Sequence, residues 1–376
     1  MRVAVLYRKL DPRFAQNFAQ DTEGREDDSE HESIVEALEA KGHDAFSFCV
    51  REDQLQKLGD LDCDLAFNLV EEGLNNDSAL EPHLPAILDV YGVPYTGGDF
   101  LSLALTTDKS RAKEILGFHQ IPTPAFQLFA AADEPLREDL TFPLIVKPLR
   151  EDASIGIFRE SVVMDEHALR RQVRRILRRY RQSAIVEEYV DGRELSVGII
   201  EQGAKKIVTP MNEVVFNVPP GALRVYTYTA KWDSESEEYE SIVPDQCPAE
   251  NVPPESEEQV RSLAIRVFEA LRLRGYARID FRLAPDGRLT VLEVNANPLI
   301  GEYSVMAVMA EKMGWSFPKF IHTIATEAYR RAQREDRAVT LRKLAASATE
   351  EEEDPKAAEA APAGKKTRSR RRSARA

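Results

Sequence analysis

Short apolar runs alternate with amphipathic segments along the first part of the chain. Residues 3–7 and 65–69 are apolar runs of strand length. Residues 29–42 have the apolar spacing of a helix, with a capping box at the start and a glycine at the end. A second helix is predicted over residues 82–91, closed by a glycine. This order of strands and helices predicts a parallel sheet with covering helices, so we expect an α/β domain over residues 1–105.

The pattern continues into a second unit, which we expect over residues 106–190. Asp108 is predicted to cap a helix that ends at Gly117. A strand at residues 142–146 is followed by a turn of small residues at 153–156. The remaining elements predicted for this unit are a helix near residues 169–181 and a strand at 184–190.

A third unit is expected over residues 191–335, beginning with a strand at 194–201. Residues 232–258 are polar and contain several prolines, which predicts a loop or a lid. Helices are predicted over residues 259–272 and near 317–331. Together these elements complete the folded body that the sequence predicts.

The helix end and a charged tail make up residues 336–376. Residues 350–354 are acidic, and basic residues crowd the end: Lys365, Lys366, Arg368, Arg370, Arg371, Arg372 and Arg375. This low complexity predicts a disordered tail, which solubilises the chain or contacts RNA weakly. The arginine-rich helix near 169–181 leaves a similar choice between a solvated face and a nucleic-acid face, with Val173, Ile176 and Leu177 inward in the first case.

Composition narrows the class of protein. The chain has 376 residues, 43% of them hydrophobic, so it can bury a core. A formal net charge of -14 argues against nucleic acid or an anionic membrane as a partner of the body. The three cysteines are too few and too scattered for a disulfide framework or a zinc site. No apolar run has the length of a membrane span, and the first ten residues lack the apolar region of a signal peptide, so we expect a cytoplasmic protein without a membrane partner.

The most informative segment is a predicted hairpin over residues 276–295. Asp286-Gly287 is a signal for a two-residue turn. Counting outward from that turn places Asp280 opposite Glu293, and Arg278 opposite Asn295. Because side chains alternate along a strand, these four share one face. The other face is then apolar and belongs to the core, with Ile279, Phe281, Leu292 and Val294.

The polar face of this hairpin has two carboxylates placed opposite each other, which repel. A divalent cation relieves that repulsion, and carboxylate and amide oxygens are the ligands that magnesium prefers. Asp280, Glu293 and Asn295 are therefore predicted to hold Mg²⁺, with Mn²⁺ as an alternative metal, beside a nucleotide. The competing interpretation is an exposed hairpin face of mixed charge, which gives Asn295 no role.

These residues and several flanking motifs resemble the ATP-grasp superfamily, and the D-alanine–D-alanine ligase family in particular. The resemblance extends from about residue 60 to 330 and rests on the order of the motifs: Gly92-Val-Pro-Tyr-Thr-Gly97, Thr107-Asp-Lys109, Ile121-Pro-Thr-Pro124, Phe142-Pro-Leu-Ile-Val-Lys147-Pro148, Val186-Glu-Glu-Tyr-Val-Asp-Gly-Arg-Glu194, Arg278-Ile-Asp280 and Leu292-Glu-Val-Asn-Ala-Asn-Pro298. It implies an ATP-grasp fold with an N-terminal Rossmann-like parallel-sheet domain, a small central α+β domain and a C-terminal antiparallel-sheet domain.

The resemblance also implies an ATP site. Lys109 and Lys147 would contact phosphates, although Asp108-Lys109 also suits an ordinary helix start. The small-residue turn, with Ser154, would close over the phosphates through its backbone N–H groups. Adenine would be bound by Glu187, Glu188 and Val190, and the ribose by Glu194; solvent-facing glutamates at a strand end are the alternative.

The implied reaction joins a carboxylate to an amine through an acyl phosphate. Arg278 would stabilise the oxyanion formed when the amine attacks. Lys231 would close over the phosphates as part of a mobile loop, or is simply a surface lysine. Ser304 would bind the carboxylate of an incoming amino acid. The partners implied are ATP and small amino-acid-like substrates, with a homodimer as a further expectation.

Departures from the family pattern gather where the first D-alanine would bind. The glycine-rich segment and glutamate after the first strand are replaced by residues 7–13, Asp152-Ala153 replaces a glycine and a serine, Trp232 replaces a tyrosine and Leu299 replaces a glycine. We therefore predict an ATP- and magnesium-dependent carboxylate–amine ligase whose first substrate need not be D-alanine. The alternatives are a nucleotide-binding regulatory protein that has lost catalysis, and an RNA-associated protein recruited by its tail.

Overall fold

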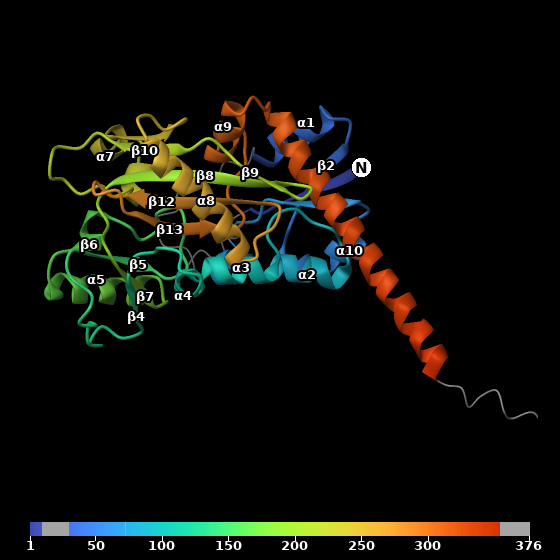
Figure 1. Cartoon of the computed structure of the whole chain (residues 1–376), viewed down its shortest axis with the longest axis horizontal. Helices are drawn as coiled ribbons and strands as arrows, with labels where there is room; N and C mark the ends of the chain where they lie inside the picture. The colour runs from blue at the N-terminus through green and yellow to red at the C-terminus, as the bar shows by residue number, and fades with distance from the viewer. Residues whose placement is uncertain (10–29, 72, 354–376) are drawn as a thin grey trace, which may run out of the picture. The chain divides into compact units, whose positions relative to one another are not determined.

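The structure is a computed structural model that describes the backbone of residues 1–9, 30–71 and 73–353, and side chains up to residue 336. Residues 1–329 form one compact unit, and residues from 330 onward form another. The expected capping residue Ser29, most of residues 7–13 and the end of the charged tail lie outside the described residues. Helices and strands are interspersed along the chain, and the strands form three sheets (Figure 1). This confirms the predicted mixed α/β class.

The first sheet is parallel, as predicted, and has the order β2-β1-β3. Its elements are β1 (Arg2–Tyr7), α1 (Glu30–Glu39), β2 (Asp44–Cys49), β3 (Leu65–Asn68), α2 (His83–Tyr91) and α3 (Phe100–Thr107), with a 3-10 segment at Glu52–Asp60. Strand β2 was not predicted, because only one of its six residues is fully buried and its apolar signal is weak. Side chains of α1, α9 (Val305–Lys312) and the start of α10 (Phe317–Glu353) complete the core on this sheet.

The second sheet is antiparallel and has the order β4-β7-β5-β6. Its elements are α4 (Lys109–Phe118), β4 (Phe126–Phe129), β5 (Leu144–Pro148), β6 (Val162–Val163), α5 (Glu166–Arg179) and β7 (Ala184–Glu188). Helix α5 packs on the sheet through Val173 and Ile176, while most of its arginines face solvent, in agreement with the solvated interpretation. Gly117 lies inside α4 and does not end it, so that boundary was wrong.

The third sheet is antiparallel, with the order β11-β10-β8-β12-β13, and β9 pairs with β8. Its elements are β8 (Arg193–Gln202), β9 (Lys205–Val208), β10 (Asn212–Phe216), α6 (Tyr228–Trp232), α7 (Glu237–Glu240), β11 (Ile242–Gln246), α8 (Pro254–Ala270), β12 (Tyr276–Leu283) and β13 (Leu289–Asn295). Helix α8 lies against β8, β12 and β13 (Figure 1). The loop or lid predicted at 232–258 was wrong in part, because this segment contains α7, β11 and the first turn of α8.

The hairpin of β12 and β13 differs from the prediction in two ways that cancel. The turn is one residue longer than expected: the Ala284 amide donates to the Arg288 carbonyl oxygen, leaving three loop residues, with Gly287 at φ 85°. A register shift then follows, since Phe281 pairs with Val291 whereas Asp280 pairs with Glu293. Leu292 is the extra residue of this bulge.

The bulge changes which residues of β13 reach the core. Val291 and Val294 are buried there, whereas Leu292 is only half-buried, so its predicted place on the apolar face was wrong. The predicted pairings of Asp280 with Glu293 and of Arg278 with Asn295 are nevertheless present. Among the described residues, no helix is long and apolar enough to cross a membrane.

Candidate active site

The third sheet presents one polar face built by β8, β12 and β13. Arg278, Asp280 and Arg282 alternate along β12 with the core residues Ile279 and Phe281. The Arg278 guanidinium donates to the Asp280 carboxylate, with Nε 2.9 Å from Oδ1 and Nη2 3.0 Å from Oδ2. This two-point contact fixes both side chains on the face that also carries Glu293 and Asn295.

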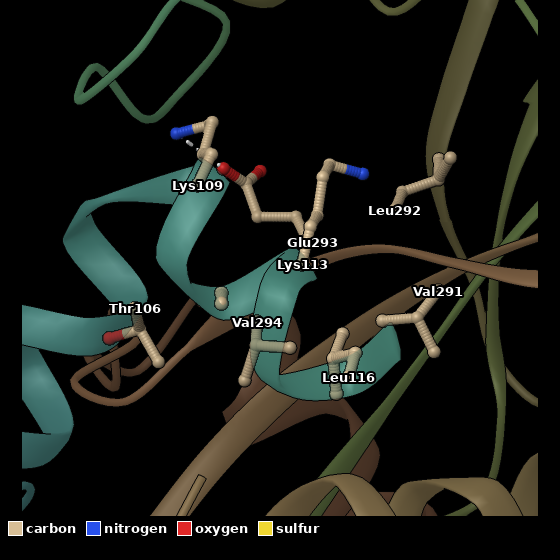
Figure 2. A pocket seen from close by; sticks show the side chains of 9 residues that line it. Thr106, Lys109, Lys113, Leu116, Val291, Leu292, Glu293 and Val294 are labelled. Carbon is tan, nitrogen blue, oxygen red and sulfur yellow. Dashed lines mark ion pairs between the residues drawn. The ribbon is translucent and has the colours of Figure 1, made fainter. Parts of the chain in front are cut away.

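A lysine from α4 reaches the same face. The Lys109 ammonium lies 2.7 Å from Oε1 of Glu293 and 2.8 Å from Oδ1 of Asp152, and it donates to the Glu151 carbonyl oxygen at 2.7 Å. Figure 2 shows the ion pair with Glu293, with Lys113 one helical turn further along α4. Lys109 thus joins the strand with predicted metal ligands to the loop after β5.

A second buried ion cluster lies on β5, β7 and α4. The Glu187 carboxylate is 1% exposed and lies 2.8 Å from the Lys147 ammonium and 3.4 Å from that of Lys113. Lys113 also donates to the Thr123 hydroxyl at 2.8 Å. The sequence reasoning missed Lys113, although its position four residues after Lys109 places both lysines on one face of α4.

Burial and charge shift the pKa values of these groups in different directions. Burial lowers the pKa of Lys113 to about 8, and the Glu187 carboxylate offsets only part of that effect. Burial also acts against the charged form of Lys109, but Asp152 and Glu293 outweigh it and raise the Lys109 pKa. Burial likewise opposes ionisation of Glu293, yet the Lys109 contact lowers its pKa to about 2. Glu293 is therefore an anion at neutral pH.

The other residues predicted to bind the nucleotide lie around these clusters. The Glu194 carboxylate accepts from Arg282 at 2.8 Å, and Glu188 pairs with Arg288 of the hairpin turn at 3.0 Å. Val190 is buried just after β7. Both carboxylates thus have an arginine partner, with the Glu194 side chain 19% exposed and the Glu188 side chain 35% exposed.

Ser154, in the loop after β5, and Lys231, in α6, both contact Tyr226. The Ser154 hydroxyl donates to the Tyr226 carbonyl oxygen at 2.7 Å. The Lys231 ammonium lies 5.8 Å from the centre of the Tyr226 ring. The turn at Ala153–Gly156 is present as predicted, with Ala153 and Ser154 in the left-handed region at φ 53° and 63°.

Ser304 has a structural contact of its own, because its hydroxyl caps α9 by accepting from the Ala307 amide at 3.1 Å. Asn295 accepts from the Asn297 amide at 3.0 Å through Oδ1. Leu299 is 44% exposed. Within the part of the chain that the structure describes, no hydrogen bond joins Ser304 to Arg278.

The oxygen atoms on the polar face suit a magnesium ion. Asp280 and Glu293 are directly opposite in the ladder, and Asn295 is two residues further along β13. Each carboxylate has a cationic side chain beside it, Arg278 for Asp280 and Lys109 for Glu293. The face therefore combines hard oxygen ligands with cations that favour bound phosphate.

Comparison with known proteins places these features in a family. Residues 118–326, more than half of the chain, match the family model described as the D-ala D-ala ligase C-terminus. The chain is 34% identical to an uncharacterised protein of Sinorhizobium fredii, over 71% of this chain and 75% of that one. It is 30% identical to a D-alanine–D-alanine ligase of Ralstonia nicotianae, over 78% of this chain and 84% of the relative.

Solved structures agree in fold. The D-alanine–D-alanine ligase of Bacillus anthracis in complex with ATP superposes with a TM-score of 0.66 at 21% identity, covering 89% of this chain and 99% of that one. The Coxiella burnetii enzyme gives the same TM-score at 18% identity, covering 92% and 99%. The ATP-grasp fold predicted from the sequence motifs is thus confirmed.

Proposed function

Because the chain belongs to the D-alanine–D-alanine ligase family of ATP-grasp enzymes, and so is an ATP-dependent ligase that forms C–N bonds, we propose that it activates a small carboxylate as an acyl phosphate and joins it to an amine. The observation that carries this proposal is the polar face on which Asp280 lies opposite Glu293 and Arg278 opposite Asn295. Beside this face, the buried Lys109 and the mostly buried Lys147 would supply the cations that phosphates need.

In the proposed reaction a carboxylate oxygen of the first substrate attacks the γ-phosphorus of ATP, and ADP leaves. The amine of the second substrate then attacks the acyl carbon, and inorganic phosphate leaves. Lys109, Lys147 and Lys231 would bind the phosphates, and Arg278 would stabilise the oxyanion. Asp280, Glu293 and Asn295 would hold Mg²⁺, which neutralises charge on the transferred phosphoryl group.

The same proposal assigns nucleotide contacts to the strand end of β7 and the start of β8. Glu187, Glu188 and Val190 would lie along the adenine, and Glu194 would accept from the ribose hydroxyls. Ser154 would hold the phosphate loop, and Ser304 would receive the carboxylate of the incoming amino acid. We further propose that the boundaries between domains lie near residues 105, 190 and 335. The protein is proposed to be cytoplasmic and to form a homodimer.

The first substrate is the open part of the proposal. Asp152 contacts Lys109 at the position of a family glycine, and it adds a negative charge beside the phosphate site. A pocket with a changed charge selects a changed substrate, so we propose that D-alanine is not the preferred first substrate.

A screen of ADP release tests the function. Purified protein with Mg-ATP is given single amino acids of both configurations and then pairs of them. Release that depends on one pair supports the ligase reaction and names the substrates. ADP release with D-alanine alone would refute the proposal that D-alanine is not the preferred first substrate. The absence of ADP release with every pair would refute the ligase proposal.

A further inference from the structure

The chain between β10 and β11 is fastened to the loop that follows β5. We call residues 226–241 the lid segment and residues 153–159 the phosphate loop. Three hydrogen bonds join them: the Ser154 hydroxyl to the Tyr226 carbonyl oxygen at 2.7 Å, the Tyr228 amide to the Ile157 carbonyl oxygen at 2.8 Å, and the Trp232 indole N–H to the Ala153 carbonyl oxygen at 3.0 Å.

A glutamate of α7 adds a second fastening. Glu238 accepts from the Arg159 guanidinium at 2.6 Å and from the Thr227 hydroxyl. The Phe158 and Tyr228 rings also lie in contact, with centroids 6.1 Å apart. The lid segment is therefore held at both ends of the phosphate loop, so the position of one follows the position of the other.

Trp232 makes several contacts within this arrangement, one of them with the Tyr228 ring, whose centroid lies 6.4 Å away. Its N–H bonds the Ala153 carbonyl oxygen, and its ring lies 5.5 Å from the Lys231 ammonium, which faces the Tyr226 ring on another side at 5.8 Å. Trp232 is 38% exposed, so core packing does not account for its place. A ring face at this distance attracts a cation.

We propose that Trp232 is a positioning residue, which anchors the lid segment through the Ala153 carbonyl oxygen and orients Lys231 through its ring. The inference rests on the proposed function, in which Lys231 closes over the phosphates of ATP. It also explains how two departures from the family pattern fit together. Ala153 has no hydroxyl, and the indole of Trp232 uses its backbone carbonyl instead.

Three variants separate the two contacts. Trp232→Phe keeps a ring but loses the N–H, and kcat/KM for ATP should fall about five-fold, the value of one hydrogen bond. Trp232→Leu loses the ring as well as the N–H, and its kcat/KM should be about three-fold lower again. Trp315→Phe is the matched control, because Trp315 has a similar lysine contact, with Lys319 at 4.8 Å, away from this segment. It should change kcat/KM less than two-fold.

A double-mutant cycle tests whether Trp232 acts through Lys231. Once Lys231→Met has removed the ammonium, Trp232→Leu should reduce kcat/KM no more than Trp232→Phe does. The reason is that the ring then has no cation to orient. Equal losses from Trp232→Leu with and without Lys231 would refute the orienting role. Wild-type kcat/KM in Trp232→Phe would refute the anchor.

Limited trypsin digestion provides a readout that does not need turnover. The bond after Lys231 should be cut several-fold faster in Trp232→Phe than in Trp315→Phe, at equal thermal stability. Equal cutting rates would overturn the anchor even in an active ligase. Faster cutting in a protein that releases no ADP with any substrate would uphold the anchor while the proposed function fails.

Discussion

The Lys109 ammonium of α4 lies 2.7 Å from the Glu293 carboxylate of β13. The same nitrogen lies 2.8 Å from Asp152 in the loop after β5, so one buried cation balances two carboxylates from separate parts of the chain. Asp280, the other carboxylate among the predicted metal ligands, is balanced separately by Arg278. Substitutions at these two carboxylates should therefore differ in their effect on stability, although both should stop the reaction.

Glu293→Gln should remove ATP turnover and leave the fold intact. The substitution removes one of the two carboxylates beside Lys109, and Asp152 still balances that cation. Turnover should fall on the order of 100-fold or more, because a ligand of the phosphoryl site is lost. ADP release and thermal unfolding measure the two effects. Normal ADP release in this variant would mean that the magnesium assignment is wrong.

Asp280→Asn should lose both turnover and stability. Arg278 is mostly buried and its two-point contact is with Asp280, so the substitution leaves a poorly balanced cation. We expect a loss of about 2 kcal/mol in the free energy of unfolding, less than for a fully buried pair. Urea unfolding of Asp280→Asn beside Glu293→Gln checks this order of stability, and equal midpoints would contradict it.

Lys113 should make stability rise with pH. Burial lowers its pKa from 10.5 to about 8. Between these values the unfolded lysine binds a proton that the folded one has lost, so the free energy of unfolding increases with pH. The shift corresponds to a gain of about 3 kcal/mol across the window.

Urea unfolding at pH 7.5 and pH 10.5 measures this gain. Lys113→Met should lack that part of the rise, because the titrating group is gone. Lys206→Met is the matched control, since Lys206 pairs with Glu269 near the surface and should leave the rise unchanged. The same rise in both variants would show that Lys113 is not its source.

Glu187→Gln should be strongly destabilising. Glu187 is buried between Lys113 and Lys147, and its loss leaves two cations close together without a counter-charge. The expected cost is about 3 kcal/mol in the free energy of unfolding. Adding Lys113→Met to this variant should recover part of the loss, which a double-mutant cycle in urea measures. If the losses of unfolding free energy from the two substitutions simply add, Glu187 and Lys113 are not coupled.

The hairpin shows how far local sequence rules reach. Pairing of Asp280 with Glu293 was predicted, yet the turn length used to count it was one residue too short. The bulge at Leu292 restored the count, and no rule of turn chemistry could have predicted it. Its signal lies in β13 itself, where Val291 and Val294 are three residues apart and both belong to the core.

The ion clusters show the other limit of the sequence. Lys109, Lys147 and Glu187 could be named from motifs, but which lysine pairs with which carboxylate depends on how α4 packs between the second and third sheets. Lys113 was missed because a lysine four residues into a helix is usually a solvated side chain. Only the packing of α4 against β13 shows that it is 3% exposed.

Removing residues 354–376 should leave turnover unchanged. All predicted site residues lie before residue 305, and among the side chains that the structure describes Ala328 is the last of α10 in this core. The basic residues removed are the ones that suggested RNA contact. ADP release and RNA binding at low salt are measured on both proteins. A truncated protein with reduced turnover would give the tail a role in the reaction.

Deleting Leu292 should be tolerated, although it shortens β13, the strand at the edge of the third sheet. Without this residue, Glu293 follows Val291 directly, so the ladder becomes regular and Glu293 still pairs with Asp280. Leu292 also lines a small pocket between α4 and β13, together with Lys109 and Glu293 of the proposed phosphate and metal site. We therefore expect a folded protein with weaker ATP binding, measured by titration with a non-hydrolysable analogue.

Deleting Val294 is the matched control with the opposite result. Asn295 would then pair with Ile279 if the bulge stays, or Glu293 would do so if the bulge is lost. Either arrangement places a polar side chain in the core, at a cost of several kcal/mol. Circular dichroism and thermal unfolding should show a folded Leu292 deletion and an unfolded Val294 deletion. If both deletion variants are unfolded, Leu292 has a structural role beyond the register shift. The strand then needs the bulge at Leu292 and cannot form the regular ladder.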